Sequence, residues 1–119
     1  MTDSREIKRA GRTSELIAHE AARFIKENAG TESLITVTRA ATLGTGTRVV
    51  VYVSVFPEDR EPSAIAFLAR QRETFSNHLK MRVRVRPLPR ITFEIDHGEK
   101  HRRRLDELSG GPGGNRTRA

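Results

Sequence analysis

The stretch that decides the fold is residues 34–56, LITVTRAATLGTGTRVVVYVSVF. Two runs rich in β-branched residues, 34–41 and 48–56, flank a turn that contains Gly44 and Gly46. A short glycine-containing connection between two such runs predicts an antiparallel hairpin. The second run is the most apolar in the chain, which indicates a central strand with a neighbour on each side.

Helical patterns lie on both sides of this hairpin. Before it, apolar and small side chains recur every three or four residues, which predicts a helix that ends near Gly30. These residues are Ile7, Ala10, Ser14, Ile17, Ala21 and Phe24. Residues 1–12 are expected to be either a loose arm or the start of this helix. After the hairpin, Pro62 suits a first helical position, and a helix is predicted from there to about Leu79 with a bend or break within 69–72.

The segment after Leu79 alternates between apolar and basic residues, which predicts a third strand with its arginines on one face. The apolar positions are Met81, Val83 and Val85, and the basic positions are Arg82, Arg84 and Arg86. Prolines at 87 and 89 interrupt the strand, because proline donates no ladder hydrogen bond, and the alternation resumes over 90–95. A short basic helix is expected over 99–108.

The order of these elements predicts an α+β domain, a three-stranded sheet covered by helices on one face. At 119 residues the chain is expected to form one domain. Residues 109–119, which hold four glycines and one proline, are expected to be disordered because they bury too little apolar surface to fold.

The positive charge is concentrated in one part of the sequence. The chain carries a formal net charge of +7. Residues 69–90 hold seven basic residues against one acidic residue, Glu73, so this window supplies all but one unit of the excess. Focused positive charge of this kind is typical of a site for a polyanion such as a nucleic acid.

Several classes of protein are excluded or disfavoured. The chain has no cysteine, so it forms no disulfide, no thiolate zinc site and no cysteine nucleophile. No membrane span or signal peptide is indicated, and a cytoplasmic protein is expected. His97 and His101 have a spacing that metal sites use, but the adjacent Lys100 and residues 102–104 place positive charge there. No metal, cofactor or catalytic motif is predicted, and an enzyme is not expected.

The alternating arginines suggest how a polyanion is bound. On a strand they would lie about 6.6–6.8 Å apart, near the spacing of successive phosphates along one nucleic-acid strand. The alternative is a solvated face or an edge charged against aggregation, although like charges on one face repel. All five phenylalanines are predicted in the core and Tyr52 lies within a strand, so base recognition by aromatic stacking is not expected. Recognition of backbone and shape fits better.

Two segments resemble the signature of a known family. Residues 79–84, LKMRVR, and 89–96, PRITFEID, are similar to the pattern L-x-(M/L)-R-x-R … P-x-L-x-F-x-x-D of ribosome-binding factor A. The runs 34–38 and 49–54 resemble the hairpin of that family, and the resemblance covers residues 5–108. It implies a KH-like domain of type II order, α-β-β-α-kink-α-β. It also implies late maturation of small-subunit ribosomal RNA, often important in the cold, without catalysis.

Three features depart from the family pattern. The helix–kink–helix of the family carries Ala-x-Gly, and Ala69-Arg70-Gln71 stands here without the glycine. Gly44-Thr45-Gly46 replaces the usual acidic turn between the first two strands, and about two extra residues surround Pro87-Leu88-Pro89. These departures indicate a divergent member, in which Arg70 and Arg72 add charge at the kink.

The sequence therefore predicts a monomeric, non-enzymatic assembly factor whose partners are small-subunit ribosomal RNA and the small ribosomal subunit. The residues expected to contact RNA are Arg70, Arg72, Lys80, Arg82, Arg84, Arg86, Arg102 and Arg103. Two alternatives remain open: a KH-like module that acts on other RNAs, and a protein-interaction module whose basic strand recognises an acidic partner.

Overall fold

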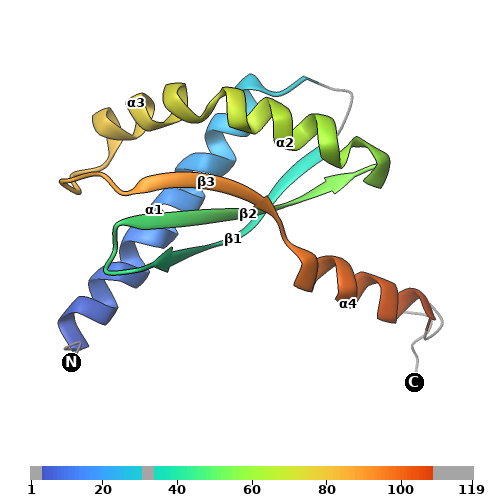
Figure 1. The fold of residues 1–119 in the computed structure, drawn as a ribbon, viewed down its shortest axis with the longest axis horizontal. Helices are drawn as coiled ribbons and strands as arrows, with labels where there is room; N and C mark the ends of the chain where they lie inside the picture. The colour runs from blue at the N-terminus through green and yellow to red at the C-terminus, as the bar shows by residue number, and fades with distance from the viewer. Residues whose placement is uncertain (1–3, 31–33, 109–119) are drawn as a thin grey trace.

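The computed structural model describes residues 4–30 and 34–108 (Figure 1). The elements are, in order, α1 (Ser4–Asn28), β1 (Leu34–Leu43), β2 (Arg48–Phe56), a 3₁₀ turn η1 (Glu58–Arg60), α2 (Glu61–Arg70), α3 (Arg72–Arg82), β3 (Arg90–Ile95) and α4 (His97–Leu108). The first helix runs without a break from Ser4, so residues 4–12 form its start. The segment 109–119, for which disorder is expected, lies outside the described residues.

The three strands form one sheet in the order β1-β2-β3. β2 is central, antiparallel to β1 and parallel to β3, so the predicted hairpin and central strand are confirmed. The pairing of β1 with β2 shifts between Val37 and Arg39, which leaves Thr38 as an extra residue in a bulge. Gly44 and Gly46 in the turn have φ of 65° and 86°, a left-handed conformation that glycine adopts without strain.

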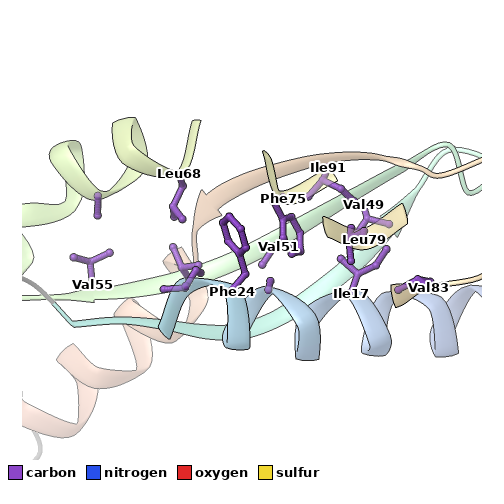
Figure 2. Packing of buried hydrophobic residues seen from close by; sticks show 14 residues of the cluster. Ile17, Phe24, Val49, Val51, Val55, Leu68, Phe75, Leu79, Val83 and Ile91 are labelled. Atoms are coloured by element: carbon purple, nitrogen blue, oxygen red, sulfur yellow. The ribbon is translucent and has the colours of Figure 1, made fainter. Parts of the chain in front are cut away.

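The core lies between one face of this sheet and the helices α1, α2 and α3 (Figures 1 and 2). Alternate valines of β2 point toward the helices, which is the pattern expected of a strand with one covered face. The fully buried side chains of this cluster include Ile17, Val49, Val51, Val53, Val55, Leu68, Phe75, Leu79 and Ile91. The predicted α+β architecture with helices on one sheet face is confirmed.

The break between α2 and α3 falls at Gln71, inside the predicted window. Gln71 has φ −88° and ψ 0°, and its amide donates to the carbonyls of Phe67 and Leu68 at 3.0 and 3.2 Å. Its own carbonyl accepts from the amide of Phe75 at 2.8 Å, so the second helix starts at once. Because any residue adopts this conformation, the backbone here does not require the glycine that the family pattern carries.

The predicted strand over 81–85 is wrong. α3 continues to Arg82, and the amide of Val83 still donates to the carbonyl of Leu79 at 2.8 Å. A strand has no partner at this point, because β2 begins at Arg48 and the pairing with β3 begins at Arg90. Residues 83–89 therefore form a loop, and Met81, predicted to point inward, is 88% exposed.

The prediction that Phe56 lies in the core is also wrong. This side chain is 67% exposed, because the alternation of β2 turns Val55 toward the helices and Phe56 away from them. Its partner across the hairpin, Leu34, is exposed as well.

Candidate nucleic-acid interface

The structure divides the predicted RNA-binding residues into three groups. One group lies at the kink, one at the end of α3 and the loop that follows, and one on α4. Along α3, Lys80 of the second group follows Arg72 of the first by about 12 Å of the helix axis. α4 extends away from the sheet on the other side of the molecule (Figure 1). The eight residues therefore do not form a single face.

Arg82 is engaged by an acid from α1. Its Nε lies 3.3 Å from Oε1 of Glu20, and Nε2 of His78 lies 3.1 Å from the same oxygen. Burial raises the pKa of Glu20, but the hydrogen bond from His78 and the charges of Arg82 and Arg23 outweigh it, so this pKa lies below its ordinary value. Arg82 thus holds α3 against α1 by pairing with a buried carboxylate.

Glu20 was not singled out in the sequence, where it belongs to the polar residues between the apolar positions of the first helix. It follows Ile17 by three residues and precedes Ala21, so it borders the buried stripe. This border position is the signal that a sequence offers for a partly buried charge, although it does not name the partner.

Arg86 caps the C-terminal end of α3. Its Nη1 donates to the carbonyls of Val83 and Val85 at 2.9 and 2.7 Å, and its Nη2 donates to the carbonyl of Lys80 at 2.6 Å. Carbonyls in the last turn of a helix lack intrahelical donors, and this guanidinium supplies one. Arg86 therefore positions the loop against the helix.

The basic residues of α4 are mostly matched by acids. Arg102 and Arg103 lie 3.2 and 3.6 Å from the carboxylate of Glu99 in the same helix. Two further ion pairs connect α4 to η1 and α2, Lys100 with Glu61 at 3.1 Å and Arg104 with Glu58 at 3.0 Å. The charge of α4 is thus largely compensated within the protein.

Four of the predicted residues remain available for a ligand. Arg70, Arg72, Lys80 and Arg84 are exposed, and within the described part of the chain no hydrogen bond or ion pair engages their side chains. The first two lie on either side of the kink. The other two lie at the end of α3, where the loop to β3 returns toward the sheet (Figure 1).

The sheet brings two further arginines to this end, Arg48 and Arg90, neither of which is among the residues predicted to contact RNA. The amide of Arg90 donates to the carbonyl of Thr47 at 2.9 Å, and Arg90 is the register partner of Arg48 in the parallel pair. Both arginines are exposed. We call Arg48, Lys80, Arg84 and Arg90 the basic end. The charged window in the sequence contains Arg90, but Arg48 is recognised only once the parallel register is known.

A hollow of about 170 Å³ lies beside the kink, between the end of α1, β1 and α2. Ser63, Phe67 and Arg70 are among its lining residues. Sites for small organic ligands usually measure about 300–1,000 Å³, so this hollow does not indicate a cofactor site. It does place Arg70 beside a concave part of the surface.

No helix in the described ranges is both long and apolar enough to cross a membrane. No three His, Cys, Asp or Glu side chains in residues 4–30 and 34–108 come together in a way that would hold a metal ion. His97 and His101 are both exposed on α4.

The arrangement defines a class of protein: a small α+β domain of KH-like type II order, with a kinked helix pair and uncompensated cations beside it. The comparisons with known proteins agree. The model of the family described as ribosome-binding factor A matches residues 9–109, and the chain belongs to this family.

Two solved structures are similar to the chain over most of its length. The crystal structure of ribosome-binding factor A from Thermus thermophilus is 28% identical, with a TM-score of 0.63 over 71% of this chain and 91% of that one. A homology model of the T. thermophilus factor, fitted into a cryo-EM map of its complex with the 30S subunit, is 27% identical. Its TM-score is 0.64, over 74% of this chain and 96% of that one. A comparison with curated protein sequences finds no match.

Proposed function

We propose that this protein is a non-enzymatic assembly factor that binds the small ribosomal subunit in the cytoplasm and assists late maturation of its ribosomal RNA. Membership of the ribosome-binding factor A family and the relative fitted into a 30S complex support the binding partner. The observation that carries the proposal is the basic end, where four exposed cations from two strands, one helix and one loop lie without acidic partners in the described residues.

Each exposed Lys or Arg side chain of the basic end and of the kink has a defined role in this proposal. Lys80 and Arg84, with Arg48 and Arg90, neutralise phosphates at the basic end, and the two arginines at the kink add a second contact. Arg82 and Arg86 position the helix and the loop that carry the first group. The four phosphate contacts of the basic end alone predict a logarithmic dependence of affinity on salt with a slope of about −3, at roughly −0.7 to −0.9 per contact, and the arginines at the kink make this slope steeper.

The proposal is tested by reversing two charges that the fold does not use. The double variant Lys80→Glu, Arg84→Glu is expected to lose co-sedimentation with small subunits and to keep its thermal unfolding midpoint within a few degrees. The matched control, Lys26→Glu with Arg60→Glu, changes the net charge equally at exposed positions away from the basic end. Unchanged pelleting of the folded Lys80/Arg84 variant would remove the basic end from the interface.

The two alternatives differ from this proposal in what they bind. A KH-like module for other RNAs would bind bulk RNA as tightly as immature small subunits, so a comparison of these two ligands with mature subunits separates them. A module for an acidic protein would keep its partner after nuclease treatment in an affinity purification. The proposed assembly factor loses its ribosomal RNA under the same treatment and prefers immature small subunits.

A further inference from the structure

The sheet face turned away from the helices carries an arginine on an aromatic ring. Tyr52 alternates with Val51 and Val53, which point into the core, so its ring lies on the opposite face. Arg39 is its register partner on β1, and the guanidinium carbon lies 3.8 Å from the centroid of the Tyr52 ring. This is a cation–π contact, in which the guanidinium of Arg39 lies over the face of the Tyr52 ring.

A buried carboxylate fixes the orientation of this guanidinium. Nε of Arg39 lies 3.5 Å from Oδ2 of Asp96, which is only 3% exposed. Asp96 in turn accepts hydrogen bonds from Oγ1 of Thr38 at 2.5 Å and from the amide of Glu99 at 3.0 Å. Even so, 55% of the Arg39 side chain is exposed. With Nε turned to Asp96 and one face on Tyr52, the other face and the terminal nitrogens are not engaged by these two partners.

The surroundings of this pair indicate which ligand it fits. An exposed acid, Glu94, is the register partner of Tyr52 on β3, and it disfavours a phosphate at this position. A carboxylate accepts hydrogen bonds from the exocyclic amino group of a nucleobase, and a guanidinium plane stacks on the base itself. Phosphates are favoured further along the same face. Arg48 precedes Tyr52 by four residues, about 13 Å along the strand, beside Arg90.

We propose that the Arg39–Tyr52 pair is a stacking platform for an unpaired RNA base with an exocyclic amino group, such as adenine, while Arg48 and Arg90 hold phosphates about two nucleotides further along the same strand. The proposal rests on the RNA-binding function inferred above and adds a second mode of contact, on the sheet face opposite the helices. It also differs from the sequence expectation of no stacking platform, because the outer surface of the platform is a guanidinium and not an aromatic ring.

The test compares two ligands that differ only in their bases, a short oligoadenylate and an abasic oligonucleotide of the same length. The wild-type protein is expected to bind the oligoadenylate about tenfold more tightly, which corresponds to one stacked base. Arg39→Lys keeps the charge but loses the flat guanidinium, so it is expected to abolish this preference and leave binding of the abasic strand unchanged. Arg60→Lys, at a distant exposed site, is expected to retain the preference.

A second measurement needs no variant. In NMR spectra of the wild-type protein, the Arg39 Nε–H and Tyr52 ring resonances are expected to shift with oligoadenylate and not with the abasic strand. Equal binding of the two ligands, binding of neither, or full preference in a folded Arg39→Lys protein would overturn the platform. Failure of the proposed function is seen separately, as unchanged pelleting of the Lys80→Glu, Arg84→Glu variant with small subunits.

Discussion

Asp96 is the residue whose replacement has the most predictable consequence for stability. Its carboxylate accepts from Thr38 of β1 and from the amide of Glu99, where it caps the first turn of α4, and it pairs with Arg39. Loss of a helix cap costs about 1 kcal/mol, and loss of a hydrogen bond to a charged acceptor about 1.5–3 kcal/mol. The pair with the exposed Arg39 adds little. Asp96→Ala is therefore expected to lower the free energy of unfolding by about 2.5–4 kcal/mol.

Asp96→Asn removes the negative charge of the side chain and keeps its size and shape. The asparagine carbonyl still caps α4, so the expected loss is about 1–2 kcal/mol, measured with urea at neutral pH and far-UV circular dichroism. Burial raises the pKa of Asp96, but the hydrogen bonds from Thr38 and Glu99 and the charges of Arg39 and Arg102 hold it below its ordinary value of 3.8. The contribution of the charge is present above that value and is lost as the pH falls through the lower folded pKa.

The difference in stability between wild type and Asp96→Asn is therefore expected to shrink as the pH is lowered below about 4. A difference that stays constant to about pH 3 would refute the role given to the charge. Equal losses of less than about 0.5 kcal/mol in the alanine and asparagine variants would refute the whole account of this residue, since surface substitutions have effects of that size.

Three further predictions concern residues in the charged window 69–90. Arg82→Glu places a carboxylate beside the buried Glu20 and is expected to lower the free energy of unfolding in urea by about 2–3 kcal/mol. The control Arg84→Glu is expected to lower it by less than about 0.5 kcal/mol, and equal losses would contradict the pairing of Arg82 with Glu20. Arg86→Ala removes three hydrogen bonds to backbone carbonyls and is expected to lower the free energy of unfolding by about 1–2 kcal/mol. It is also expected to speed hydrogen exchange at the amide of Val83, and unchanged exchange there would argue against the cap. Gln71→Gly is expected to lower the free energy of unfolding by about 0.5–1 kcal/mol. It is not expected to improve binding to small subunits, because the kink adopts a conformation open to any residue, and tighter co-sedimentation would show that the missing glycine matters.

Local patterns in the sequence predict most of the fold. β-branched runs around two glycines predict the hairpin, and the apolar period predicts the first helix. The prediction fails over 81–85, because five alternating residues are too few to distinguish a strand from a helix end followed by an extended loop. The choice is made by tertiary structure, since β2 starts at Arg48 and offers no partner to residues before Arg90.

The candidate site is only partly predictable for a similar reason. The charge window contains Lys80, Arg84 and the arginines of the kink, which the structure leaves exposed. It does not show that Arg82 and Arg86 serve the fold, because their partners are a buried acid in α1 and the backbone of α3. Arg48 and Arg39 are not selected either, since their places depend on cross-strand register and not on neighbours in the sequence.

The most direct test of the central claim is the salt dependence of binding to small ribosomal subunits. For the wild-type protein, the logarithm of the association constant is expected to fall with the logarithm of salt concentration with a slope of about −3 or steeper. Lys80→Ala with Arg84→Ala removes two phosphate contacts and is expected to make this slope shallower by about 1.5, while Lys26→Ala with Arg60→Ala leaves it unchanged. An unaltered slope in the Lys80/Arg84 variant would contradict phosphate binding by the basic end.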